Sequence, residues 1–230
     1  MKKRILFCGC GGMYNYFLGV ANVLQNNFEL DNIEFSGVSA GNIPAVLLSL
    51  NMDINKLFEE KNIPFLENIN NYITKSLFNW NSCVRELLYD ILPENVDVLL
   101  SNKYQSYITS LPYLKSIKIS NWDSKEMFID TIIGSSFIPL FDTKLYQKLN
   151  YNGKNIYCLD GGLSNYNIHN INNNDNLLKL TIDMWRKMET NWYYCYNDIT
   201  WANKLYNWGK EDALKNLDYF NNFLKKIEKR

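Results

Sequence analysis

The residues Glu34–Asn42 (EFSGVSAGN) contain the pattern Gly-x-Ser-x-Gly, with Ser39 between Gly37 and Gly41. In enzymes with this pattern, a sharp turn between a strand and a helix exposes the serine hydroxyl as a nucleophile. Such a serine attacks an ester or amide carbonyl when a nearby base takes its proton. Short glycine patterns are also ordinary structural turns, so the interpretation depends on what precedes and follows Ser39.

A second glycine cluster, Gly9-Cys10-Gly11-Gly12, follows a short apolar run and precedes a predicted helix. Backbone N–H groups in such a turn point outward and can hold an anion, either a phosphate or the oxyanion of a tetrahedral intermediate. A dinucleotide site would need a third glycine where this chain has Tyr14, which disfavours that reading. An oxyanion site and a purely structural turn both remain open.

The candidate base is Asp160, which ends an apolar run and is followed by Gly161 and Gly162. Sites in open α/β folds collect at the carboxyl ends of strands, although Asp-Gly is also common in simple turns. His169 is the single histidine, nine residues later, and the order Ser39, Asp160, His169 matches a Ser-Asp-His triad. That spacing is short for a triad, so we favour a dyad in which Asp160 takes the serine proton directly, helped by burial that raises its pKa.

The apolar residues recur in short runs and at helical spacing, which predicts alternating strands and helices and therefore an α/β fold with a parallel sheet. The expected strands are Arg4–Cys8, Ile33–Val38, Tyr104–Thr109, Leu114–Ser120, Asn155–Leu159 and Leu177–Asp183. The expected helices are Tyr16–Leu24, Asn42–Leu50, Asp53–Lys61, Cys83–Leu92, Ser124–Ile133 and the C-terminal stretch Asp198–Lys229.

The composition excludes several classes of protein. With 230 residues, 47% of them hydrophobic, the chain is long enough to bury a core, and its net charge of +0 does not favour nucleic acid as a partner. No apolar stretch approaches the roughly 20 residues of a membrane span, and the N-terminal apolar run is too short for a signal peptide. Five scattered cysteines without a CxxC pair indicate free thiols in an intracellular, cytoplasmic protein, and they disfavour a metal site.

Three segments together resemble the patatin-like phospholipase family, in particular its adipose triglyceride lipase and adiponutrin branch. Gly9–Val20 (GCGGMYNYFLGV) is similar to the family's glycine-rich opening. Gly134–Phe141 (GSSFIPLF) is similar to its Ser-x-Phe-x-Pro segment, and Leu205–Leu217 (LYNWGKEDALKNL) to a family helix with a Gly-x-x-Asp-Ala core. With Ser39 and Asp160, the matching segments cover nearly the whole chain in order.

The resemblance implies a three-layer α/β fold with a mostly parallel central sheet flanked by helices. It implies one domain over residues 1–230, with a core at about 4–183 and a helical part at about 198–230. It also implies a Ser39–Asp160 dyad without a catalytic histidine, an oxyanion hole from the turn Gly9–Gly12, and hydrolysis of lipid acyl esters without a metal or organic cofactor.

Two residues depart from the family pattern: Tyr14 replaces a glycine of the first motif, and Ile168 stands near where a proline usually follows Asp-Gly-Gly. These departures leave open an alternative, a catalytically weak or inactive lipid-binding module that keeps the fold.

A lipid substrate further suggests contact with a membrane or lipid-droplet surface. Three segments mix large apolar residues with lysines, as interfacial segments do: Pro64–Trp80, Phe137–Tyr146 and Tyr219–Arg230. An apolar stripe on a helix more often packs inward, so each segment is equally well explained as part of the core.

Overall fold

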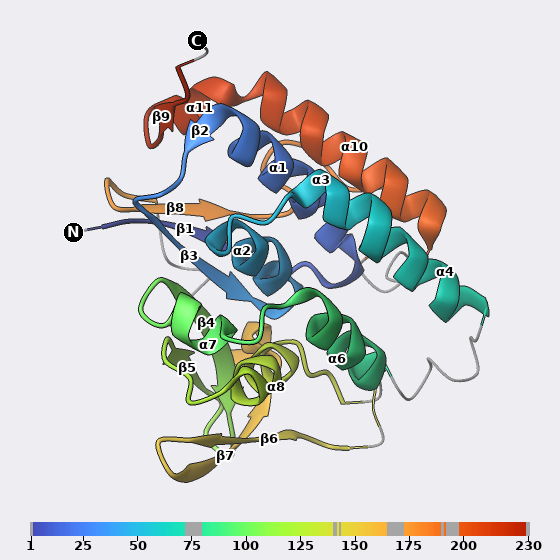
Figure 1. The fold of residues 1–230 in the computed structure, drawn as a ribbon, viewed down its shortest axis with the longest axis vertical. Helices are drawn as coiled ribbons and strands as arrows, with labels where there is room; N and C mark the ends of the chain where they lie inside the picture. The colour runs from blue at the N-terminus through green and yellow to red at the C-terminus, as the bar shows by residue number, and fades with distance from the viewer. Residues whose placement is uncertain are drawn as a thin grey trace.

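The computed structural model describes residues 2–71, 80–139, 142, 144–164, 173–189, 191 and 198–228. A seven-stranded sheet crosses the centre of the molecule (Figure 1). Hydrogen-bonded pairs link its strands in the sequence β6-β7-β4-β3-β1-β8, and β5 also pairs with β4. Its strands are β1 (Lys3–Phe7), β3 (Ile33–Val38), β4 (Tyr104–Ser110), β5 (Lys115–Ile119), β6 (Gln147–Tyr151), β7 (Lys154–Leu159) and β8 (Leu177–Leu180). The strands β8, β1, β3 and β4 run parallel, whereas β5, β6 and β7 join by antiparallel pairing.

Three helices cover one face of this sheet: α1 (Tyr14–Asn27), α2 (Asn42–Ser49) and α8 (Lys125–Ser135). The crossovers from β1 to β3 and from β3 to β4 step in the same direction, so their right-handed connections place α1 and α2 on the same side. Ring contacts fix the packing: Phe7 of β1 meets Phe17 of α1 at 5.4 Å, and Tyr104 of β4 meets Phe128 of α8 at 5.9 Å. This face therefore holds the main hydrophobic core.

The remaining helices lie at the ends of this layer. The segment after α2 forms α3 (Ile54–Leu57), a π-helical turn η3 (Phe58–Asn62) and α4 (Ile63–Asn71); α6 (Trp80–Ile91) and α7 (Val96–Leu100) follow. The chain ends with α10 (Ile199–Lys215), α11 (Leu217–Asn221) and a short strand β9 (Lys225–Lys226), which pairs with β2 (Phe28–Glu29). No helix among the residues described here is long and apolar enough to cross a membrane.

The helices α1 and α10 cross where each carries a glycine. A Cβ atom added to Gly19 would lie 2.0 Å from the carbonyl oxygen of Tyr206, and one added to Gly209 would lie 2.0 Å from that of Tyr16. Beside this crossing the Tyr16 hydroxyl donates a hydrogen bond of 3.0 Å to the Asp212 carboxylate. The same carboxylate accepts two hydrogen bonds of 2.8 Å from the Arg186 guanidinium. The Gly-x-x-Asp-Ala stretch of the sequence thus attaches α10 to the core.

The expected α/β fold with a mostly parallel central sheet flanked by helices is confirmed. Several details of the sequence prediction were wrong or incomplete, and the short elements β2 and α7 were not predicted. The strand β6 was missed, the helix expected at Asp53–Lys61 continues through a π-helical turn into α4, and the C-terminal stretch is not helical to Lys229 because it turns after α11 and adds β9 to β2.

Candidate active site

Ser39 lies at the sharp turn that the sequence predicts. It follows β3, starts the 3-10 turn η2 (Ser39–Gly41) and leads directly into α2. Its φ of +53° lies in the left-handed region, which is strained for a residue with a side chain and marks sites where the surrounding structure imposes the conformation. A Cβ atom on Gly37 would lie 2.4 Å from the Cα of Asn42, and one on Gly41 would lie 2.5 Å from the carbonyl oxygen of Phe7. Both glycines are therefore required by close backbone packing.

The strand register explains why Asp160 lies beside Ser39 although 121 residues separate them. The strands β3 and β5 both pair with Ser106 and Tyr107, so they occupy opposite edges of β4. Further along, β5 and β7 both pair with Thr109 and Ser110, so β7 shares an edge of β4 with β3. Along this edge β3 and β7 run toward each other, because β3 is parallel to β4 and β7 is antiparallel to it. Ser39 follows β3 and Asp160 follows β7, so the two residues meet where the strands end.

The Ser39 hydroxyl donates a hydrogen bond of 2.5 Å to Oδ2 of Asp160. Both residues are buried, with 7% of each exposed. Burial raises the pKa of Asp160 from 3.8 to about 6, and the hydrogen bonds from Ser39 and the Gly162 N–H only partly oppose it. Desolvation thus makes this carboxylate a stronger base than an exposed aspartate.

The two glycines after Asp160 form the turn that orients its carboxylate. The Gly162 N–H donates to Oδ1 of Asp160 at 2.6 Å, which leaves Oδ2 for Ser39. A Cβ atom on Gly161, the first residue of the 3-10 turn η4 (Gly161–Ser164), would lie 2.2 Å from the carbonyl oxygen of Tyr107. The Thr109 hydroxyl donates to the Asp160 carbonyl oxygen at 2.7 Å. The position of the Asp160 carboxylate therefore depends on glycine at the positions that follow it.

Ser135 at the end of α8 supports the strained turn, a role that sequence reasoning missed. Its hydroxyl accepts from the Ser39 N–H at 3.0 Å and from Nδ2 of Asn42 at 2.8 Å, and it donates to the Tyr107 carbonyl oxygen at 2.6 Å. Its position in Gly134–Phe141, a segment already noted for its resemblance, was the available signal.

Asn42, the residue after the Gly-x-Ser-x-Gly pattern, is the second support. Its Nδ2 also donates to the Ser39 carbonyl oxygen at 2.7 Å. Its Oδ1 accepts from the hydroxyls of Tyr104 and Ser106, so all four hydrogen-bonding positions of this fully buried amide are used. Together, Asn42 and Ser135 tie the Ser39 turn to β4 and α8.

The turn Gly9–Gly12 lies against the same serine. A Cβ atom on Gly9 would lie 3.3 Å from the Cβ of Ser39, and Gly11 has a φ of +52° at the start of the 3-10 turn η1 (Gly11–Met13). Among the described residues, the N–H groups of Gly11 and Gly12 have no protein acceptor, and both glycines line a cavity with Ser39. Cys10 is buried beside them. This arrangement can accept an anionic oxygen next to the serine.

The cavity beside Ser39 is lined almost entirely by apolar side chains. They come from α1, α2, η3, α4, α6 and the segment after α8, and include Leu18, Leu47, Phe58, Phe65, Leu88 and Ile138. The polar lining is limited to a few groups such as Lys61, Asn62 and Asn81. Such a cavity suits a long apolar group attached to a carbonyl at Ser39.

Tyr14, which replaces a family glycine, is accommodated at the edge of this cavity. Its hydroxyl donates to Oδ1 of Asn62 at 2.6 Å, and Nδ2 of Asn62 donates to Oδ1 of Asn15 at 2.8 Å. The π-helical turn η3 carries Asn62. Ile168 and His169 lie outside the described residues, so a triad through His169 stays untested.

Comparison with known proteins gives relatives of one kind. No family model matches the chain. The 1-acylglycerol-3-phosphate O-acyltransferase Pnpla3 of Mus musculus is 28% identical over 61% of this chain and 35% of its own length. Patatin-like phospholipase domain-containing protein 4 of Homo sapiens is 26% identical over 70% of this chain and 65% of its own length. The omega-hydroxyceramide transacylase of Mus musculus is 27% identical over 60% of this chain and 24% of its own length. The chain therefore spans less than two thirds of the curated relatives it matches.

Among solved structures, VipD from Legionella pneumophila matches with a TM-score of 0.45 and 16% identity, over 78% of this chain and 49% of that one. Patatin-like phospholipase domain-containing protein 2 of Homo sapiens is a further relative, 26% identical over 70% of this chain. The resemblance found in the sequence is confirmed: the curated homologues of this chain are patatin-like phospholipase domain-containing proteins and lipid acyltransferases related to them.

Proposed function

We propose that the protein is a serine acyl hydrolase of lipid esters that works with a Ser39–Asp160 dyad. The observation that carries the proposal is the hydrogen bond from Ser39 Oγ to Asp160 Oδ2, at the head of an apolar cavity. The homology to lipid-acting enzymes supports the same class of reaction.

In the proposed mechanism, Ser39 Oγ attacks the ester carbonyl carbon while Asp160 takes the serine proton. The negative charge that develops on the carbonyl oxygen is held by the N–H groups of Gly11 and Gly12, with Gly9 and Cys10 shaping the turn. Asp160 then gives its proton to the departing alcohol, and an acyl-serine remains. Water attacks this acyl-serine, with Asp160 again as base, and releases the carboxylic acid and the free serine.

The apolar cavity is proposed to hold the acyl chain. A chain bound among Leu18, Phe58 and Leu88 places its carbonyl at Ser39 and excludes bulk water from the dyad. This favours substrates with a long acyl group, such as phospholipids, lysophospholipids or acylglycerols, over short polar esters.

Two other outcomes have specific support. Relatives named as acyltransferase and transacylase favour a lipid hydroxyl, rather than water, as the second acyl acceptor. The departures at Tyr14 and Ile168 favour an inactive lipid-binding module.

An intracellular, cytoplasmic location is part of the proposal, supported by Cys8, Cys83 and Cys158, which form no disulfide in the described part of the chain.

The deciding experiment has two arms. A fluorophosphonate should label the wild type and not Ser39→Ala, because labelling requires an activated serine. A screen over phospholipids, lysophospholipids and acylglycerols, with and without a lipid alcohol, should then show free fatty acid or transferred acyl group as product. Turnover by the wild type is expected to exceed that of Ser39→Ala by a factor on the order of 10⁴ to 10⁶. An unlabelled wild type without turnover would support the inactive module.

A further inference from the structure

The antiparallel end of the sheet exposes a group of large apolar side chains that the proposed catalytic centre does not use. They lie at the β4–β5 turn, around the start of β6, on β7 and on η4; we name them the hairpin surface: Tyr113, Leu114, Leu145, Tyr146, Tyr157 and Leu163. Tyr113 and Leu145 are 78% and 77% exposed, far more than packing residues. Contiguous exposed apolar groups usually mark a binding surface.

Contacts between the two hairpins make this surface continuous. The N–H of Leu111, at the β4–β5 turn, donates to the Tyr157 carbonyl oxygen at 2.8 Å. The Tyr146 and Tyr157 rings meet edge to face at 4.9 Å. Because Ile156 and Cys158 of β7 face the core, the Tyr157 side chain points to the opposite face, away from α8.

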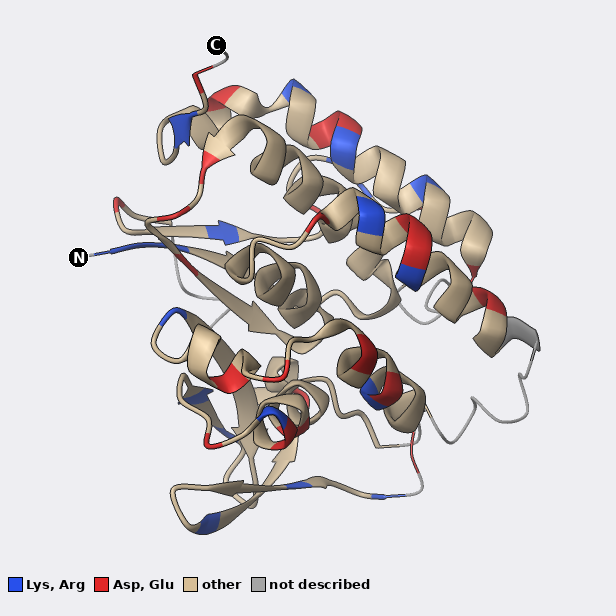
Figure 2. Cartoon of the chain, viewed as in Figure 1, with Lys and Arg blue, Asp and Glu red and all other residues tan. Residues whose placement is uncertain are grey.

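The same hairpins are locally cationic, although the whole chain has a net charge of +0. Residues 104–119 and 144–159 contain no Asp or Glu and carry the five lysines Lys115, Lys118, Lys144, Lys148 and Lys154. All five are exposed, and none forms an ion pair with a carboxylate among the described residues. Figure 2 shows the β6–β7 hairpin with basic positions only.

We propose that the hairpin surface docks the protein on an anionic lipid membrane. Exposed tyrosines beside lysines suit the headgroup region, where the ring enters the interface and the ammonium group stays near phosphates. The exposed leucines favour a lipid surface over nucleic acid, because aliphatic side chains bind the hydrocarbon boundary and contribute little to phosphate recognition. This inference deepens the proposed function, on which it rests for the nature of the substrate.

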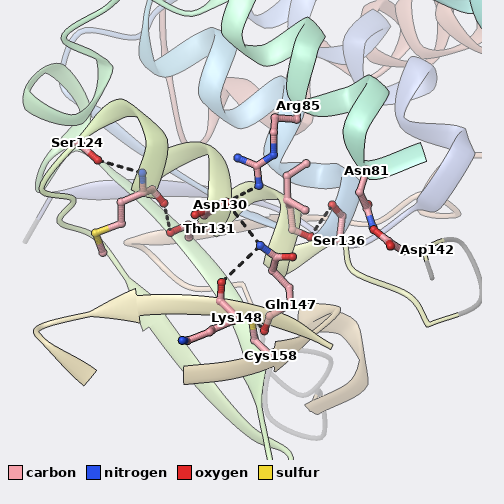
Figure 3. A network of polar contacts seen from close by, with 12 residues as sticks. Asn81, Arg85, Ser124, Asp130, Thr131, Ser136, Asp142, Gln147, Lys148 and Cys158 are labelled. Carbon is pink, nitrogen blue, oxygen red and sulfur yellow. Dashed lines mark hydrogen bonds and ion pairs between the residues drawn. The ribbon is translucent and has the colours of Figure 1, made fainter. Parts of the chain in front are cut away.

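The hairpin surface is fixed relative to the acyl cavity. In Figure 3, Arg85 of α6 pairs with Asp130 of α8, which also accepts from Nε2 of Gln147 in β6 at 3.5 Å. On the same side, Asn81 of α6 lines the cavity and donates to Asp142 at 3.0 Å, just before Leu145 and Tyr146 in the chain. Docking through the hairpins would therefore hold the cavity in a constant orientation relative to the membrane.

The C-terminal segment predicted to bind lipid is less suited to do so. Phe220, Phe223 and Leu224 are buried, with 0%, 7% and 6% of their surface exposed, so they pack inward. Among the described residues of the segment Phe137–Tyr146, Phe137 is buried, whereas Leu145 and Tyr146 at its end are exposed. The exposed end of Phe137–Tyr146 therefore belongs to the hairpin surface, while residues 72–79 of the predicted segment Pro64–Trp80 lie outside the described residues.

The test is co-sedimentation with vesicles of phosphatidylcholine alone and with added phosphatidylserine. Wild type and Ser39→Ala should bind the anionic vesicles equally, because docking does not need the nucleophile. The double substitution Lys144→Glu/Lys148→Glu should weaken this binding at least about 20-fold, since each lysine near an anionic surface adds a factor of about five. Leu114→Asn/Leu145→Ser should weaken it about tenfold; asparagine suits the φ of +49° at Leu114.

Matched controls lie at the opposite end of the molecule, near α10 and β9 (Figure 1). Lys215→Glu/Lys226→Glu makes the same change in net charge, and Leu214→Asn/Ile227→Ser removes two other exposed aliphatic side chains. Both should bind vesicles like the wild type. Equal binding by hairpin and control variants, no preference for anionic vesicles, or binding to DNA but not to vesicles would overturn the inference. Hydrolysis of a short soluble ester, measured on each variant, tests the catalytic centre separately.

Discussion

At the residue scale, the properties of Asp160 follow from opposing effects of known direction. Burial raises its pKa, while the hydrogen bonds from Ser39 and Gly162 lower it, and burial prevails to leave a value of about 6. A base must be unprotonated, so hydrolysis of a soluble ester should fall as the pH drops through about 6. A kcat/KM profile checks this: a single acid limb near pH 6 is expected, and an unchanged rate down to pH 4 would contradict Asp160 as base.

The same pKa shift predicts the stability of Asp160→Asn. Because the folded pKa lies above the unfolded value of 3.8, the folded state holds the proton more tightly and loses stability as the pH rises from about 4 to 6. Asparagine carries no charge to bury, so at pH 7 the variant should be inactive but more stable, by about 2–3 kcal/mol for a shift of about two units. Urea unfolding at pH 7 and pH 4 measures it; the difference should nearly vanish at pH 4.

His169 separates the dyad from a triad. If Asp160 acts alone, His169→Ala keeps most of the activity, whereas Asp160→Asn loses it because an amide does not take the serine proton. Steady-state rates of the two variants on one soluble ester decide the point. Equal and severe losses would establish a Ser-Asp-His triad in place of the dyad.

Ser135 is predicted to act as a positioning residue through Ser39. Ser135→Ala removes the acceptor of the Ser39 N–H and the donor to the Tyr107 carbonyl oxygen, and it leaves buried groups unsatisfied. We expect kcat to fall at least about tenfold with little change in KM, because the nucleophile is misplaced while the acyl cavity is intact.

A control variant shows whether a fall in kcat for Ser135→Ala comes only from a loss of folding stability. Ser124→Ala removes the N-cap of the same helix, where the Ser124 hydroxyl accepts from the Met127 N–H at 3.1 Å, and should cost about 1 kcal/mol. Its kcat should equal that of the wild type. A similar fall in kcat for both variants would assign Ser135 a purely structural role.

At the element scale, the sequence predicts local secondary structure well, but it predicts poorly which distant segments contact each other. The alternation of apolar runs predicts the parallel strands, and the turn chemistry of Gly37–Gly41 and Asp160–Gly162 predicts where the polar residues stand. The head-on approach of β3 and β7 leaves no local signal, because it depends on the pairing register along β4. For the same reason the support that Ser135 gives to Ser39 was missed, because the two residues are 96 positions apart.

The strand β6 and the chain end show a second limit. In β6 the inward positions are Gln147, Leu149 and Tyr151, and because the first of them is polar the strand lacks a strong apolar alternation. The last residues have helical apolar spacing, yet Phe220, Phe223 and Leu224 are buried by a turn and by the pairing of β9 with β2. Tertiary packing, not local propensity, decides the structure of such segments.

The crossing of α1 and α10 gives an element-scale prediction. Gly209→Ala places a methyl group 2.0 Å from the Tyr16 carbonyl oxygen, a backbone atom that cannot move without shifting α1. Unfolding stability should fall by more than about 3 kcal/mol, well beyond the usual effect of a surface substitution. Asn207→Ala on the exposed side of α10 is the control and should change stability by about 0.5 kcal/mol or less. Urea unfolding of both variants measures the difference; equal stabilities would mean that the helices cross less closely.

At the scale of the whole molecule, charges are balanced in number but not in place. The chain has 24 basic and 24 acidic residues, yet the lysines of the two hairpins form no ion pair within the described part of the chain, whereas most of the ion pairs seen there lie on the helical side. The apolar cavity lies in the layer of helices. The hairpins lie at one end of the molecule, and α10 lies at the other end (Figure 1). In the proposed docking only the cationic end meets an anionic surface, so ionic strength should act on that end and not on the whole molecule equally.

This asymmetry predicts how salt affects the proposed reaction. Raising the ionic strength from 0.1 M to 1 M shortens the Debye length from about 10 Å to about 3 Å, which screens exposed lysines but not the buried Ser39–Asp160 pair. Hydrolysis of an ester carried in anionic vesicles should therefore fall several-fold, while hydrolysis of a soluble ester stays nearly constant. Lys144→Glu/Lys148→Glu should hydrolyse the vesicle ester slowly at both salt concentrations, because it lacks the attraction that salt screens. A parallel fall on both substrates would place the salt effect at the catalytic centre and not at the hairpins.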